Sequence, residues 1–188
     1  MAQIMETPQY QAGNFNAEAT TKQKEREKII RILSPDQLSR VINDLTGFEW
    51  TWRGYAQLEN DELGYRVLGG GIDGLEVFSS QDDASLSWAL VVLRMSQFAA
   101  DHAIRHELER DTSSKLFQHV SLDDTPGDDA FQREIEQLHW RLLGTKADQQ
   151  WKDDITLLWS DIHDNSGPSA AWKGVLSALF SDPEFVSY

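Results

Sequence analysis

Apolar residues recur at helical spacing along most of the chain. In residues 36–45 they lie on one face of a helix, at Leu38, Val41, Ile42 and Leu45. Ser34 before this segment and Gln37 three residues later have the pattern of a capping box, and Gly47 is suited to end the helix. The sequence therefore predicts a helix with defined ends at this place.

The same periodicity predicts five further helices and the centre of the fold. These helices lie within residues 17–33, 85–111, 131–142, 151–162 and 166–180. The stretch from Trp88 to Leu93 is apolar on every side, which is typical of a helix buried in the middle of a fold.

Residues 48–80 follow a different pattern. Phe48, Trp50 and Trp52 alternate with polar residues, and this period of two predicts a short strand or extended piece. Residues 64–68 and 75–79 flank a glycine cluster, and we expect both to be extended as well.

Together these patterns predict a mainly α, single-domain helical bundle over residues 17–188. Residues 48–80 form a small irregular or extended insert in this prediction. Residues 1–16 are polar and contain Pro8 and Gly13, so we expect them to form an extended arm.

Composition narrows the range of partners. The chain has 31 acidic and 17 basic residues, a formal net charge of −14. Nucleic acids and anionic lipid surfaces repel such a field, so we expect no nucleic-acid partner. No stretch has the roughly 18–20 apolar residues that span a bilayer, so we expect no direct membrane insertion. Residues 1–7 have neither the basic start nor the apolar stretch of a signal peptide, so an exported form would be processed or trimmed.

The chain contains no cysteine. This excludes disulfides, thiolate metal sites, cysteine nucleophiles and covalent c-type haem attachment. The sequence therefore predicts no cofactor held by this chain itself.

The glycine cluster is the first candidate site. Gly69, Gly71 and Gly74 satisfy G-x-G-x-x-G, but no helix begins at the third glycine, as a dinucleotide-binding motif requires. The spacing of a calcium-binding repeat is matched only from Gly69 to Asp73. We interpret the cluster as a structural turn, with Asp73 as a candidate ligand for a bound ion.

Two histidines form the second candidate site. His102 and His106 are four residues apart on a predicted helix, and two imidazoles at this spacing can hold one metal ion. The zincin order H-E-x-x-H is absent, because Ala103 occupies the position of the catalytic glutamate. The alternative is a pair of surface histidines near a helix end.

The tryptophans have two interpretations. Those on helical stripes are predicted to lie in the core: Trp140, Trp151, Trp159 and Trp172. Trp50 and Trp52 face one side of an extended piece, where they either form a buried edge or stack on a sugar or a partner protein.

Two stretches near the end of the chain, LHWRLLG and AWKGVLSALFSDPEFVSY, carry a resemblance. They resemble the C-terminal region of large exported planctomycete and myxobacterial proteins of unassigned function, many of which carry a cytochrome-c-like domain. LTGFEW and SLSWALVVLRMSQFAA are similar to the middle of such proteins. The resemblance implies a periplasmic or cell-envelope location near redox proteins. Because C-x-x-C-H is missing here, a haem would have to belong to a partner chain.

These observations lead to one hypothesis and two alternatives. The hypothesis is a non-catalytic accessory or structural subunit of a larger bacterial envelope assembly, whose partners are other protein subunits, including a haem protein. One alternative is a metal-dependent enzyme that uses His102 and His106. The other is a carbohydrate-binding module that uses Trp50 and Trp52.

Overall fold

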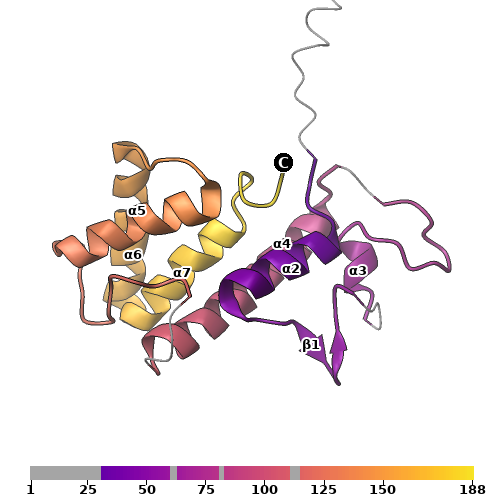
Figure 1. Ribbon diagram of the computed structural model, residues 1–188, viewed down its shortest axis with the longest axis horizontal. Helices are drawn as coiled ribbons and strands as arrows, with labels where there is room; N and C mark the ends of the chain where they lie inside the picture. Colours follow the sequence, from indigo (N-terminus) through magenta and orange to yellow (C-terminus); the bar gives the residue numbers. More distant parts are fainter. Residues whose placement is uncertain (1–30, 60–62, 81–82, 111–114) are drawn as a thin grey trace, which may run out of the picture. The chain divides into compact units, whose positions relative to one another are not determined.

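The computed structural model describes residues 31–59, 63–80, 83–110 and 115–188 (Figure 1). Its helices are α2 (Pro35–Thr46), α3 (Tyr65–Leu68), α4 (Leu86–Ala103), α5 (Asp129–Leu143), α6 (Gln149–Ser166) and α7 (Pro168–Phe180), and a π-helix over Ile104–Leu108 continues α4. Strands β1 (Thr51–Trp52) and β2 (Tyr55–Ala56) form one antiparallel pair. The prediction of a mainly α fold is confirmed.

The N-terminal predictions fall mostly outside the described residues. This holds for the arm over residues 1–16 and for residues 17–30 of the first predicted helix. Residues 31–33 were expected to end that helix, but they are extended, and Ile32 forms an antiparallel bridge with Ser187. The backbone N–H of Leu33 donates to the carbonyl of Val186 at 2.8 Å, so a distant partner decides the local conformation.

The ends of α2 are those that the sequence predicts. The Ser34 hydroxyl accepts a hydrogen bond from the Gln37 N–H at 3.3 Å, and the Gln37 side chain accepts one from the Ser34 N–H at 2.9 Å. Gly47 has a φ of +73°, a left-handed conformation that glycine adopts without steric cost. Local chemistry therefore fixes both ends of this helix.

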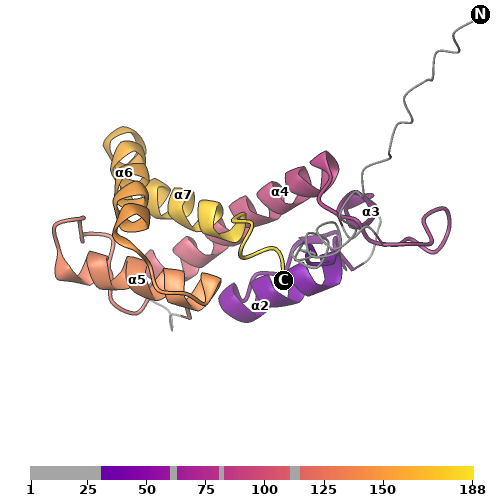
Figure 2. The same ribbon diagram turned by 90° about the horizontal axis from the view of Figure 1, so that it is seen from above.

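Helix α4 packs against α2, α3 and α7 (Figure 2). Ser85 caps its first turn by accepting a hydrogen bond from the Trp88 N–H at 3.1 Å. Its buried residues lie on one face: Trp88, Val91, Val92, Met95, Ser96, Ala99, Ala100 and Ala103. The prediction that this helix is central to the fold is confirmed.

Aromatic rings join α5, α6 and α7. Phe131 lies 5.2 Å from Trp159 and 5.1 Å from Trp172, measured between ring centroids, and Phe117 lies 5.5 Å from Trp172. All four rings are buried, which confirms two of the predicted core tryptophans. Trp140 is 64% exposed, so its predicted core position is wrong.

The insert is less extended than predicted. Strand β1 covers only Thr51–Trp52, residues 65–68 form α3, and residues 75–79 form bends and no strand. Arg66 on α3 forms an ion pair with Asp36 on α2 at 2.6 Å, and it also donates to the carbonyls of residues 58 and 72. The alternation of apolar and polar residues with a period of two cannot predict long-range contacts of this kind.

Candidate functional site

Exposed apolar side chains are concentrated in one part of the sequence. Of the fourteen large exposed ones among the described residues, eleven lie between positions 52 and 98. They are Trp52, Tyr55, Leu63, Leu68, Ile72, Leu75, Phe78, Leu86, Leu90, Leu93 and Phe98. Where exposed apolar side chains lie together in space, they are typical of a binding surface.

Helix α4 contributes a second apolar face to this region. Leu86, Leu90 and Leu93 are 79%, 59% and 42% exposed, at the four- and three-residue spacing of one helical stripe. We call these three residues the outer leucine face. The prediction that the apolar stretch from Trp88 to Leu93 is buried on every side is wrong for this face, because the neighbouring helices cover the opposite one.

The two tryptophans of the insert have different surroundings. The Trp50 ring packs against Tyr65 at 4.6 Å and against Phe98 at 5.7 Å, so it links the insert to α4. Trp52 is 51% exposed and pairs with the exposed Tyr55 across the hairpin. Trp52 is therefore accessible to a ligand, whereas the Trp50 ring is packed against Tyr65 and Phe98. The carbohydrate-binding hypothesis stays a prediction.

Asp73 holds a turn together. Its Oδ1 accepts hydrogen bonds from the backbone N–H groups of residues 75, 76 and 77 at 2.8, 2.9 and 2.9 Å. The hydrogen bond from the Val77 N–H has the largest effect, and together these bonds hold the pKa of the Asp73 carboxyl below its usual value. A Cβ at Gly71 would lie 2.9 Å from the Arg66 carbonyl oxygen, so this glycine permits a close chain approach. The geometry accounts for a structural turn, and ion binding at Asp73 stays a prediction.

His102 and His106 lie together at the junction of α4 and the π-helix. Their ring centroids are 4.2 Å apart, and Phe48 lies 5.5 Å from the His102 ring. Burial, and then the neighbouring His106, lower the pKa of His102. Within the described residues, no group of three or more histidine, aspartate or glutamate side chains is arranged to hold a metal ion.

Two buried glutamates hold the connection between the π-helix and α5. Glu107 Oε2 accepts hydrogen bonds from the N–H groups of residues 116 and 117 at 2.7 and 3.1 Å. Glu134 Oε2 accepts from the next two, residues 118 and 119, at 3.0 and 2.6 Å. We call this arrangement the carboxylate clamp. Four consecutive backbone donors therefore have carboxylate partners, and the segment is fixed without regular structure.

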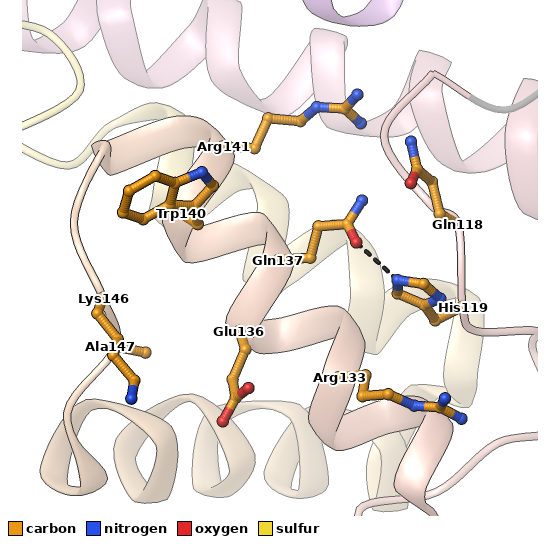
Figure 3. Close-up of a pocket in the computed structure, with 9 residues that line it drawn as sticks. All are labelled: Gln118, His119, Arg133, Glu136, Gln137, Trp140, Arg141, Lys146 and Ala147. Atoms are coloured by element: carbon orange, nitrogen blue, oxygen red, sulfur yellow. Dashed lines mark hydrogen bonds between the residues drawn. The ribbon is translucent and has the colours of Figure 1, made fainter.

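The clamp positions side chains beside the outward face of α5. Figure 3 shows Arg133, His119 and Arg141 along one flank of α5 and Trp140 on the other. These residues belong to the lining of an open depression of about 720 Å³. His119 Nε2 and Gln137 Oε1 are joined by a hydrogen bond of 2.6 Å.

Sequence reasoning missed the outer leucine face and the face of α5. A signal existed for the first, because leucines at positions 86, 90 and 93 repeat at helical spacing beside a second apolar stripe. The face of α5 requires knowledge of which loop lies beside the helix, and two glutamates distant in sequence determine this.

Comparison with known protein families, with curated proteins and with solved structures finds no match to this chain. Among the described residues, no helix is both long enough and apolar enough to cross a membrane.

The clamp makes a prediction about pH. Burial raises the pKa of Glu134 above its ordinary value of 4.5, and it outweighs the hydrogen bonds from His119 and Gln118. The folded protein therefore resists ionisation of Glu134, and this residue's contribution to stability falls as the pH rises above 4.5. The free energy of unfolding of Glu134→Gln, relative to wild type, should increase from pH 4.5 to pH 7 in urea titrations.

Glu136→Gln is the matched control, and its stability relative to wild type should change with pH in the opposite direction. Lys152 lowers the pKa of Glu136, so the wild-type residue contributes stability that is lost as the pH falls below 4.5. This variant should therefore lose stability relative to wild type as the pH rises from 3 to 5. If the free energy of unfolding relative to wild type changed with pH in the same direction for both variants, this would contradict the assignment of Glu134 as a buried carboxylate.

Proposed function

We propose that this protein is a non-catalytic subunit of a larger assembly and binds a partner protein through the outer leucine face of α4. The observation that carries the proposal is the concentration of exposed apolar side chains between positions 52 and 98. Exposed apolar surface of this kind is costly in water and is typical of protein–protein contacts.

The chemistry of α4 favours a protein partner. Residues 84–100 contain a single charged residue, Arg94, in a chain of which 26% is charged. The guanidinium of Arg94 lies 4.4 Å from the centre of the Phe98 ring. A partner that covers this face would therefore desolvate few charges, and each leucine that it buries fully would contribute roughly 1.5–3 kcal/mol.

We further propose that the assembly belongs to the bacterial cell envelope and includes a haem protein. The resemblance of residues 138–144 and 171–188 to exported planctomycete and myxobacterial proteins supports this location. The absence of cysteine means that the partner chain, and not this one, would carry a covalently attached haem.

Site-specific photo-crosslinking in the cells of origin tests the proposal. A photoreactive amino acid in place of Leu90 should give one discrete adduct, because the partner covers this position. The same amino acid in place of Leu157, which is 60% exposed on α6, serves as the control and should give no adduct. Adduct formation is read from the gel mobility of the tagged chain, and mass spectrometry identifies the partner.

The absence of an adduct at Leu90 and also at Leu93 would count against a partner on the outer leucine face. An adduct of the same identity and yield at Leu157 would count against it too, because it would show non-specific contact.

A second candidate function is metal binding by His102 and His106. The 4.2 Å separation of the two imidazole rings favours it, and so does the lowered pKa of His102, because a neutral imidazole is the form that binds a metal. In this proposal, water or a partner side chain completes the coordination, and the site supports a metal-dependent activity.

Zinc titration by calorimetry tests the second candidate. Wild-type protein should bind one zinc ion at pH 7.5 and bind it more weakly at pH 5.5, where protons compete for the imidazoles. His102→Ala should abolish binding. His163→Ala is the control, since this ring stacks on Trp159 at 4.6 Å, and it should bind zinc as wild type does. Equal affinities for the two variants would refute the site.

A further inference from the structure

The groove beside α5 gathers positive charge in an acidic protein. Arg133 and Arg141 line one flank of the helix, with the His119 side chain beside them, as Figure 3 shows. Within the described lining of the depression, Glu136 is the single carboxylate, and it forms an ion pair with Lys152. The lining of the depression therefore carries more basic than acidic side chains, although the chain as a whole has a net charge of −14.

The arginine and histidine side chains of this groove are held in place. Arg141 Nη1 donates to the backbone carbonyls of Lys115 and Leu116 in the clamped segment. His119 is fixed by its bond to Gln137, and its backbone is fixed by Glu134. Arg133 Nε donates to the Asp129 carbonyl at 3.2 Å. A ligand would therefore lose less free energy in ordering these side chains.

The spacing of the arginines determines the kind of ligand. Arg133 and Arg141 are eight residues apart, about 12 Å along a helix. The depression is open, whereas sites for small molecules enclose most of their ligand. In an extended peptide, side chains four residues apart are separated by about 13 Å. Two carboxylates at that spacing match the rise between the two arginine positions on the helix.

We propose that this groove, the basic groove, binds an extended acidic segment of a partner protein, with acidic side chains at positions i and i+4. The exposed Trp140 lies on the other flank of α5 and offers an aromatic contact to residues beside the segment. Nucleic acid is the rival polyanion, and a single-stranded DNA of matched length serves as the comparison in the experiment below. The basic groove and the outer leucine face have no residue in common, so the two proposals are tested separately.

Fluorescence anisotropy with a labelled ten-residue peptide of alternating glutamate and alanine tests the basic groove. Wild-type protein should bind the peptide at 20 mM salt and lose most of the affinity at 500 mM, because salt screens exposed charges. Arg133→Gln should weaken binding about threefold, and Arg133→Glu should weaken it further. Arg40→Gln and Arg40→Glu, at an exposed position on α2, make the same changes in net charge and should bind as wild type.

Three outcomes would overturn the proposal. They are an absence of peptide binding at low salt, equal losses for the variants at Arg133 and Arg40, and binding of a ten-nucleotide single-stranded DNA as tight as that of the peptide. Circular dichroism confirms that each variant is folded, which is expected because both arginines are exposed.

Discussion

The packing of α4 against α7 is the interaction on which the rest of the structure depends. On α4, the small residues Ala99, Ala100 and Ala103 are fully buried, and small side chains allow helices to approach closely. Asp101 on α4 then reaches Lys173 on α7 at 2.8 Å. Because α4 also contacts α2 and α3, it connects the insert to the group formed by α5, α6 and α7.

This arrangement separates two kinds of surface. The opposite face of α4 is left exposed and apolar, while the carboxylate clamp orders a segment that lies beside the basic flank of α5. One surface suits a contact driven by apolar burial, and the other suits a weaker, salt-sensitive contact. A subunit with two such surfaces is suited to join two other proteins, which agrees with the function that we propose.

Local signals predicted α2, α4, α5, α6 and α7, whereas α3 and the extended residues 31–33 were not predicted. Ser34, Gln37 and Gly47 fix α2 by chemistry within a few residues, so its ends could be predicted. Residues 65–68 form a helix in which Arg66 reaches Asp36, thirty residues away, and Trp140 is 64% exposed although it lies on α5. Neither outcome follows from the local sequence pattern. The candidate histidine pair follows from a four-residue spacing, whereas the clamp depends on glutamates that no short motif connects.

The central claim is that the outer leucine face of α4 does not stabilise the fold. The free energy of unfolding of the double variant Leu90→Gln/Leu93→Gln, measured by urea denaturation, tests it most directly. Because the Leu90 side chain is 59% exposed and the Leu93 side chain 42%, the account predicts a change of less than about 1 kcal/mol from wild type. A loss of about 4 kcal/mol or more, as core leucines give, would show that these leucines are part of the core and would contradict the account.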